Sequence, residues 1–239
     1  MTDSVVLVHL YPRRMNIYGD GGNVLALRRR LEWRGFKVET VTVDEGDDFD
    51  FTRADLVVAG GGEDRSQRAI AFDLVGRGDA IVEAVAEGVV FLTVCGSYQL
   101  FGRRFVTVDG DEIPGIGVFA AETVAGDKRM IGNVVVEGPW GRLVGFENHS
   151  GRTLLDPGQA TLGVVRRGSG NDGSSGQEGA VVGNCFGTYL HGSLLPKNPD
   201  LADDLIRRAL ERRSGASVTL APLDDAVERA AADRAATRP

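Results

Sequence analysis

Residues 89–100 read Val-Val-Phe-Leu-Thr-Val-Cys-Gly-Ser-Tyr-Gln-Leu, and this stretch decides the fold. Its first six residues are almost all apolar and rich in β-branched side chains, which predicts a buried central strand. Cys95 comes next, followed by the small residues Gly96 and Ser97 and by the beginning of a helix. This order is typical of a nucleophile elbow, whose sharp turn needs small neighbours and points the side chain out of the carboxyl edge of a sheet. The helix N-terminus favours a thiolate at Cys95, and the Gly96 amide is placed to donate to an oxyanion.

A cysteine at the end of a buried strand is more often an inert core residue, because free cysteine is among the most buried residue types. The small residues after Cys95 weaken that interpretation, and a histidine late in the chain decides against it. Residues 187–192 read Gly-Thr-Tyr-Leu-His-Gly, which predicts a strand over residues 180–190 that leads directly into His191. A nucleophilic cysteine needs a base that is remote in sequence and close in space. We therefore expect Cys95 and His191 to form the catalytic pair.

The remaining histidines and the second cysteine are given packing roles. His149, within Glu-Asn-His-Ser-Gly at residues 147–151, competes with His191 as the base, but a turn or packing histidine is the favoured interpretation. His9 lies on the first buried strand and is predicted to be a satisfied core histidine. Cys185 lies inside a strand, where packing is the usual role. The cysteines are far apart and no clustered His/Cys spacing occurs, so we expect neither a disulfide framework nor a metal site.

Strands and helices alternate through the first half of the chain. Apolar strands are predicted at residues 5–10, 37–43, 54–59 and 89–94, and helices at residues 23–34 and 66–87, with interruptions at Gly76 and Gly78. Fully apolar strands in this alternation indicate a parallel sheet covered by helices on both faces. The second half has strand-like segments at residues 117–124, 131–136, 144–146, 162–165 and 180–190, and a helix at 199–213. We expect an α/β domain over residues 1–213 and an Ala-rich tail over 214–239, with a helix around 223–236 that docks weakly or frays.

The composition excludes several classes of protein. The chain has 239 residues, of which 42% are hydrophobic and 26% charged, so a core can form without disulfides or metals. A net charge of −7 argues against a nucleic-acid binder. The apolar run at residues 5–8 is too short for a signal segment or a membrane span, so we expect a soluble, cytoplasmic protein with no membrane insertion. The run Arg28–Arg30 is interpreted as a solvated helix face, with an acidic partner as the alternative.

Three glycine-rich segments accompany these elements. Gly60, Gly61 and Gly62 follow the third predicted strand; a flexible turn is the ordinary interpretation, but near a nucleophile their amides can approach a substrate carbonyl. Residues 19–23 precede a helix without the spacing of a dinucleotide fingerprint, and we interpret them as a loop that lines the site. Residues 168–179 are rich in glycine and serine and have no apolar anchor, which predicts a mobile, dispensable surface loop.

The order of glycine loop, Val-Cys-Gly-Ser-Tyr-Gln-Leu elbow and late Tyr-Leu-His-Gly resembles the class I (triad-type) glutamine amidotransferases, and within them the cobyric acid synthase-like branch. Four further segments more specifically resemble the glutaminase subunits of lipid II isoglutaminyl synthases. They are Tyr-Gly-Asp-Gly-Gly-Asn (18–23), Lys-Arg-Met-Ile-Gly-Asn (128–133), Gly-Phe-Glu-Asn-His-Ser-Gly-Arg-Thr (145–153) and His-Gly-Ser-Leu-Leu-Pro-Lys-Asn-Pro (191–199). The resemblance covers about residues 5–213 and leaves the tail outside it.

This resemblance implies a flavodoxin-like fold with a mostly parallel sheet, and an active site at its carboxyl edge. Either Gly61 or Gly62 would join Gly96 in the oxyanion hole. Arg129 matches the position expected to bind the carboxylate of L-glutamine, which a guanidinium can hold with two hydrogen bonds; a surface arginine at a strand start is the alternative. Gln99 is also implied to bind the substrate.

The resemblance implies a heterodimer with a Mur-ligase-like ATPase subunit of the MurT type. Ammonia released from glutamine would pass to that partner, which amidates the α-carboxylate of D-glutamate in lipid II during peptidoglycan synthesis. ATP and Mg are expected on the partner, with no cofactor in this chain. Two alternatives stay open: a glutaminase subunit for another amidation, such as that of a corrinoid, and a non-catalytic scaffold subunit with the same fold.

One position departs from the pattern of the family. Many class I enzymes have a glutamate two residues after the histidine, whereas this chain has Ser193. A hydroxyl can orient an imidazole but cannot neutralise its charge. The acid must come from elsewhere in the chain or from the partner, and we expect the isolated chain to be a slow glutaminase.

Overall fold

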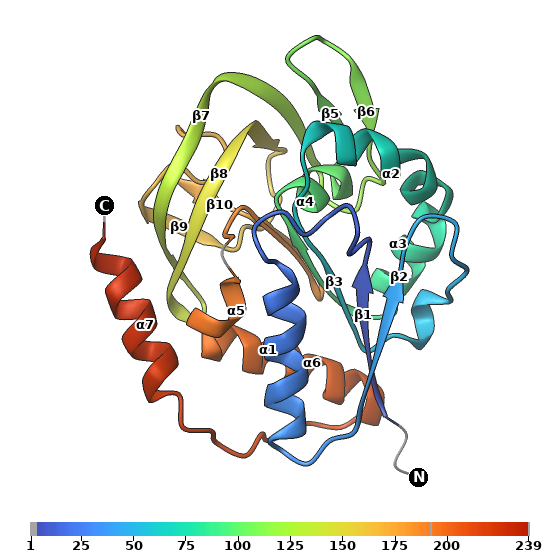
Figure 1. The fold of residues 1–239 in the computed structure, drawn as a ribbon, viewed down its shortest axis with the longest axis vertical. Coiled ribbons are helices and arrows are strands. Elements are labelled where there is room, and N and C mark those ends of the chain that lie inside the picture. The colour runs from blue at the N-terminus through green and yellow to red at the C-terminus, as the bar shows by residue number, and fades with distance from the viewer. Residues whose placement is uncertain (1–3, 192, 239) are drawn as a thin grey trace.

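The computed structural model describes residues 4–191 and 193–238, and a six-stranded sheet with the order β11-β12-β4-β3-β1-β2 forms its centre (Figure 1). Its strands are β1 (Val5–Leu10), β2 (Val38–Val43), β3 (Leu56–Ala59), β4 (Val90–Val94), β11 (Ala180–Val182) and β12 (Cys185–Thr188). All neighbouring strands are parallel except β11 and β12. The predicted mostly parallel sheet is therefore confirmed. Every residue of β3 and β4 is buried, as coverage of both faces requires.

Helices cover both faces of this sheet, as expected (Figure 1). The helical elements are α1 (Gly21–Glu32), the 3-10 turn η1 (Phe51–Arg53), α2 (Asp64–Gly76), α3 (Gly78–Ala86), α4 (Gly96–Phe101), α5 (Leu194–Lys197), α6 (Pro199–Ser214) and α7 (Ala226–Thr237). Helices α1 and α6 contact each other on one side, and α2 and α3 lie on the other. The break between α2 and α3 confirms the interruption predicted at Gly76 and Gly78. Within the two described ranges, no helix has the length and apolarity to cross a membrane.

A second, mostly antiparallel sheet lies beside the first. Its strands are β5 (Arg104–Val106), β6 (Glu112–Pro114), β7 (Ala121–Gly138), β8 (Gly141–Leu155), β9 (Gly163–Arg167) and β10 (Gln177–Glu178). Only β5 and β7 pair in parallel. The separate strands expected at residues 117–124 and 131–136 are one long strand, because β8 pairs with β7 on both sides of an irregularity between Ala125 and Met130.

The strand predicted over residues 180–190 is wrong, because the chain forms a hairpin there. Gly183 has a φ of 56°, which glycine adopts without steric cost, and it turns β11 into β12. Strand β12 ends at Thr188, three residues before His191. His191 instead forms an isolated bridge with Phe146 of β8, in which the His191 amide donates to the Phe146 carbonyl at 2.8 Å. The histidine thus lies between the two sheets.

The segment 168–179 is not the loosely attached surface loop that its composition suggests. Asn171 is 1% exposed and Glu178 is 0% exposed. The Asn171 side chain donates to the Gly179 carbonyl at 3.0 Å and accepts from the Gly179 amide at 2.8 Å. The carboxylate of Glu147, on β8, accepts the amides of residues 169 and 170. Polar side chains anchor the segment where apolar ones are lacking, so the expectation that it is dispensable is withdrawn.

Replacing residues 169–178 by a short glycine turn is therefore expected to lower the melting temperature. The change removes both backbone amides that donate to the buried Glu147 carboxylate, and an unsatisfied buried polar group costs about 1–3 kcal/mol. Differential scanning calorimetry of the shortened chain measures the effect. The matched control is Gln177→Ala, which changes an exposed side chain of the same segment. If the shortened chain had the same melting temperature as the wild type, these hydrogen bonds would contribute nothing to stability.

Arg30 is not on a solvated helix face, contrary to the interpretation of the arginine run. It is 3% exposed, and its guanidinium pairs with Asp203 of α6 and with Asp225, which precedes α7. The two preceding arginines are exposed. The helical period explains the difference, because position 30 lies beside the buried Leu27 and Leu31 on the inner face of α1.

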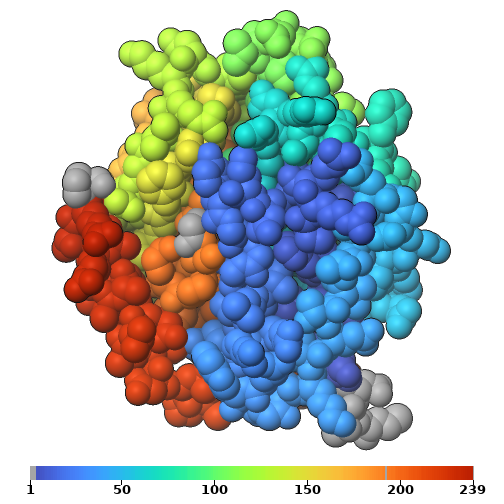
Figure 2. Space-filling view, viewed as in Figure 1, coloured from blue at the N-terminus to red at the C-terminus, as the bar shows by residue number. Residues whose placement is uncertain are grey.

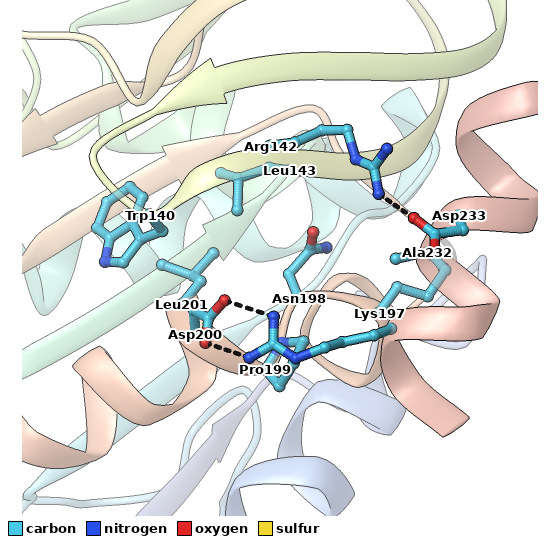
Figure 3. A pocket seen from close by; sticks show the side chains of 11 residues that line it. Trp140, Arg142, Leu143, Lys197, Asn198, Pro199, Asp200, Leu201, Ala232 and Asp233 are labelled. Atoms are coloured by element: carbon cyan, nitrogen blue, oxygen red, sulfur yellow. Dashed lines mark hydrogen bonds and ion pairs between the residues drawn. The ribbon is translucent and has the colours of Figure 1, made fainter. Parts of the chain in front are cut away.

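The predicted helix of the tail is present as α7, and it packs against β7, β8 and α5. Arg142 of β8 pairs with Asp233, and Asp200 of α6 pairs with Arg229. Figure 3 shows Arg142 pointing toward Asp233 beside a pocket of about 450 Å³ between α7 and the body of the protein. Ala232 is the only residue of α7 whose side chain is buried, so the helix contributes little to the core. These two ion pairs are exposed and contribute little stability, whereas the Arg30–Asp225 pair before the helix is buried, so weak docking of the tail stays a prediction. The domain boundary at residues 213 and 214 stays a prediction.

Candidate active site

Cys95 occupies the sharp turn between β4 and α4. Its φ of 51° and ψ of −105° are strained for a residue with a side chain, as in a nucleophile elbow. The Cys95 amide donates to the carbonyl of Thr188 at 2.8 Å, which ties the turn to the end of β12. The cysteine is 7% exposed. The strand–elbow–helix geometry expected from the sequence is confirmed.

The residues after Cys95 are small because the glycine loop packs directly against them. A Cβ on Gly96 would lie 3.0 Å from the carbonyl oxygen and 3.1 Å from the amide nitrogen of Gly62. The hydroxyl of Ser97 donates to the carbonyl of Gly60 at 2.6 Å. The elbow and the loop that follows β3 therefore hold one another in place.

Gly61 lies between the two predicted catalytic side chains. A Cβ there would come within 2.5 Å of His191 Cε1 and 3.2 Å of Cys95 Cβ, so only glycine fits. The Gly61 amide donates to Asp20 Oδ2 at 2.7 Å, and its single hydrogen is used in that bond. The proposal of Gly61 as an oxyanion donor is therefore corrected for this arrangement. Gly62 and Gly96 remain the candidates, since neither amide donates to another described residue.

His191 is fully buried beside Cys95. Its Nδ1 lies 3.3 Å from Asp20 Oδ1, and the ring of Tyr18 meets it edge-on at 4.8 Å between centroids. Burial alone would lower the pKa of His191, but the charges of Cys95 and Asp20 and the hydrogen bond to Asp20 outweigh it and raise the pKa to about 10. A protonated imidazole beside a thiolate is the pair that a cysteine nucleophile needs. Gly192, the glycine expected to form the turn after the histidine, lies outside the described residues.

Asp20 is the candidate for the acid that the sequence did not reveal. It is 0% exposed, with one carboxylate oxygen toward His191 and the other on the Gly61 amide. Ser193 does not replace it, because its hydroxyl donates to the carbonyl of Gly19 at 2.8 Å. The only sequence signal was an aspartate within the glycine loop at residues 19–23. That loop does line the site, as expected, but the role of Asp20 within it was missed.

A pocket of about 640 Å³ opens over Cys95. Its wall includes Gln99 of α4, Arg129 of β7 and Asn148 of β8, so both predicted substrate-binding residues, Gln99 and Arg129, share the pocket with the nucleophile. Arg129 is exposed and donates through Nε to the Asn148 side-chain oxygen at 2.6 Å. Its Nη2 also donates to the Asn148 carbonyl at 3.4 Å, so the guanidinium is held in the pocket wall, where its remaining donors can bind a carboxylate.

Arg129→Ala is expected to raise the KM for glutamine with little change in kcat. The proposed partner of the guanidinium is a carboxylate distant from the scissile amide, so the lost interaction stabilises substrate and transition state alike. Losing such a charge-assisted pair costs about 2–4 kcal/mol of binding. Steady-state hydrolysis of glutamine measures both constants. Arg152→Ala, which removes another arginine near the pocket that is not part of its wall, is the control. An unchanged KM in the Arg129 variant would remove this residue from the site.

Gln99 lies in the pocket wall and is held by buried hydrogen bonds from both ends of its side-chain amide. It is 3% exposed, and its carbonyl accepts from Gln67 at 3.0 Å. Its amide nitrogen donates to the hydroxyl of Tyr189 at 3.0 Å. Each end of the amide can form one further hydrogen bond, so a contact with the substrate stays a prediction.

The other candidate side chains have the packing positions expected of them, with one exception. His149 stacks on Tyr189 at 3.5 Å between ring centroids, and its Nδ1 lies 2.8 Å from the Gly151 carbonyl, although its ring also forms part of the pocket wall. Cys185 is 0% exposed, and burial raises its pKa well above the ordinary value. His9 is buried but not satisfied, because its Nε2 has no hydrogen-bond partner among the described residues.

The arrangement of Cys95, His191 and Asp20 is that of a cysteine-based acyl-transfer site. In such a site a cysteine thiolate is the nucleophile, an imidazolium beside it is the proton donor, and a carboxylate orients the ring and balances its charge. The Gly62 amide nitrogen lies 3.1 Å from where a Cβ on Gly96 would be, so the two candidate oxyanion donors are close together beside Cys95.

Comparison with known proteins finds a match to one family and to curated relatives. Residues 6–199 match the CobB/CobQ-like glutamine amidotransferase domain. The chain is 39% identical to the lipid II isoglutaminyl synthase (glutamine-hydrolyzing) subunit GatD of Staphylococcus aureus, over 87% of this chain and 86% of that one. It is 37% identical to the subunit of the same name from Streptococcus pneumoniae, over 92% of this chain and 85% of the other.

Solved structures resemble the fold at low sequence identity. The PurLQS structure from Thermotoga maritima matches with a TM-score of 0.57 and 15% identity, covering 88% of this chain and 99% of that chain. At this level of identity the likeness concerns the fold alone. It supports the flavodoxin-like fold that the resemblance implied.

Proposed function

The chain belongs to the CobB/CobQ-like glutamine amidotransferase family, and we propose that it is the glutamine-hydrolysing subunit of a lipid II isoglutaminyl synthase. The observation that carries the proposal is the meeting of Cys95, His191 and Asp20 around Gly61, with Cys95 in the wall of the pocket. Identities of 39% and 37% over most of the chain to curated subunits of that enzyme support the choice of reaction.

Hydrolysis begins with attack of the Cys95 thiolate on the side-chain amide carbon of glutamine. The carbonyl oxygen becomes an oxyanion that accepts from the amides of Gly62 and Gly96. The His191 imidazolium protonates the amide nitrogen, the C–N bond breaks, and ammonia leaves a thioester on the cysteine. The neutral imidazole then takes a proton from water, the hydroxide displaces the thiolate, and glutamate is released. Asp20 orients the ring through both steps.

The ammonia is consumed by a partner subunit in this proposal. The partner is a Mur-ligase-like ATPase of the MurT type in a heterodimer with this chain, and it amidates the D-glutamate α-carboxylate of lipid II for peptidoglycan synthesis. ATP and Mg belong to that partner, and this chain needs no cofactor. The heterodimer is proposed to be cytoplasmic.

The test is to combine the chain with the Mur-ligase-like ATPase of the same organism and to follow amidation of lipid II with ATP and Mg. We expect amidation with glutamine as the nitrogen source. With Cys95→Ala, amidation should stop with glutamine and continue with ammonium chloride, because the partner retains its own chemistry. Lipid II that stays unamidated with both nitrogen sources, while a corrinoid substrate is amidated by its synthetase with this chain, would overturn the proposal.

A further inference from the structure

The backbone just before His191 is not held by a sheet. Strand β12 ends at Thr188, and His191 pairs with Phe146 of the other sheet. Tyr189 and Leu190 cross between the two sheets in a conformation that is neither strand nor helix, yet both are buried. Buried amides need acceptors, so some other group must fix this crossing.

Two side chains provide the missing acceptors. Glu178 Oε1 accepts the amide of Tyr189 at 2.8 Å and the hydroxyl of Thr188 at 2.6 Å. The Thr188 hydroxyl oxygen in turn accepts the amide of Leu190 at 3.0 Å. The crossing is thus held by a carboxylate and a hydroxyl in place of a neighbouring strand.

Glu178 is itself rigidly placed. It belongs to β10, and its own carbonyl accepts the amide of Leu162 at 2.9 Å. The same Thr188 that it holds also accepts the amide of Cys95 through its carbonyl, at 2.8 Å. Thr188 therefore links Glu178 to Cys95, and Tyr189, which Glu178 also binds, is two positions before His191 in the chain. Glu178 itself has no hydrogen bond to Cys95 or His191.

The chemistry of Glu178 fits this position. Its second oxygen, Oε2, has no hydrogen-bond partner among the described residues. Burial raises the pKa of Glu178 to about 7, against the hydrogen bonds from Thr188 and Tyr189, which lower it. A proton on Oε2 leaves Oε1 free to accept both bonds, so either protonation state can hold the crossing.

We propose that Glu178 is a positioning residue for the glutaminase reaction, which sets the place of His191 relative to Cys95 by holding the backbone from Thr188 to Leu190. The inference rests on the proposed function and adds to it a residue from the segment 168–179, which the sequence presented as dispensable. A misplacement of about 1 Å at a catalytic group can lower a rate by about 100-fold.

The test compares Glu178→Leu with Glu178→Gln in the full chain with its partner. The leucine variant removes the acceptor, whereas the glutamine variant keeps an oxygen at Oε1. For Glu178→Leu we expect kcat to fall about 10- to 100-fold with KM nearly unchanged, since the effect is on the geometry of the reacting groups. Glu178→Gln should restore most of the rate.

A second readout does not depend on glutamine turnover. The pH dependence of Cys95 alkylation by iodoacetamide reports the thiolate that pairs with His191. In Glu178→Leu we expect alkylation to need a higher pH, because a thiol that no longer pairs with an imidazolium ionises less readily. If the wild-type protein does not hydrolyse glutamine at all, the proposed function fails, and the alkylation profile still decides the role of Glu178.

Asp172 offers a matched control in the same segment. Its Oδ1 accepts the amides of Ser174 and Ser175 at 2.7 Å each, and it has no contact with the crossing. Asp172→Leu should lower the melting temperature without lowering kcat. An equal loss of kcat in Asp172→Leu would overturn the proposal, because the integrity of the segment would then be what matters.

Thr188→Val keeps the inference testable if Glu178→Leu does not fold. This nearly isosteric change removes the hydroxyl that joins Glu178 to the Leu190 amide. We expect the same loss of kcat and the same shift of the alkylation profile. Wild-type kcat and an unshifted profile in a folded Thr188→Val or Glu178→Leu protein would overturn the assignment.

Discussion

Cys95→Ser is expected to lower glutamine hydrolysis by roughly 1,000-fold or more, the size of loss typical when a nucleophile is removed from an assembled site. Cys95 is strained at the end of β4 and faces a histidine whose pKa is raised to about 10, a combination that favours a thiolate. A serine hydroxyl in the same place ionises far less readily. Steady-state glutamine hydrolysis measures the loss.

Cys185→Ala is the control for this prediction. Cys185 is 0% exposed within β12 and burial raises its pKa, so its thiol is neither accessible nor ionised. The alanine variant should retain kcat, with a lower melting temperature from the small cavity. An electrophilic analogue of glutamine should label one peptide, the one that contains Cys95. Labelling that persists in Cys95→Ser and disappears in the Cys185 variant would reverse the assignment.

Asp20→Asn is expected to lower kcat by about 100- to 10,000-fold, the range expected when a triad acid loses its charge. The carboxylate has two roles in the structure, since one oxygen lies 3.3 Å from His191 Nδ1 and the other accepts the Gly61 amide at 2.7 Å. Asparagine keeps the size of the side chain but cannot neutralise an imidazolium. Because Asp20 is one of the groups that raise the pKa of His191, its loss lowers that pKa. The fall of kcat on the alkaline side of its pH profile, where His191 loses its proton, should then begin at a lower pH.

The same variant decides between an internal acid and one from the partner. With Asp20 in place, the isolated chain should already hydrolyse glutamine, and docking of the partner can add to the rate by ordering the glycine loop. Asp55→Asn is the control, because Asp55 is a buried carboxylate, 4% exposed, that pairs with Arg213 away from the site. Should Asp20→Asn keep the wild-type rate in the heterodimer while neutralising a partner carboxylate abolishes it, the acid belongs to the partner.

Much of the scaffold followed from local sequence. The apolar run before Cys95 and the small residues after it predicted the strand, the elbow and the helix, all of which are present. The glycines at positions 76 and 78 predicted the break between α2 and α3. The second half was predicted less well, because Gly183 turns a single expected strand into a hairpin, and composition alone did not distinguish it from an ordinary strand glycine.

Local sequence predicted Cys95 as the nucleophile and His191 as the base, because small residues follow a cysteine at the end of an apolar strand and because the resemblance covered both motifs. Only the tertiary structure placed Asp20 against His191, 171 positions away in the sequence. Only it showed that the Gly61 amide is already engaged and that Glu178 is buried behind the histidine. Local sequence sets backbone conformation and the period of burial. Which polar groups meet depends on how separate elements pack, and a carboxylate in a glycine-rich loop has the same local pattern whether it faces solvent or a catalytic imidazole.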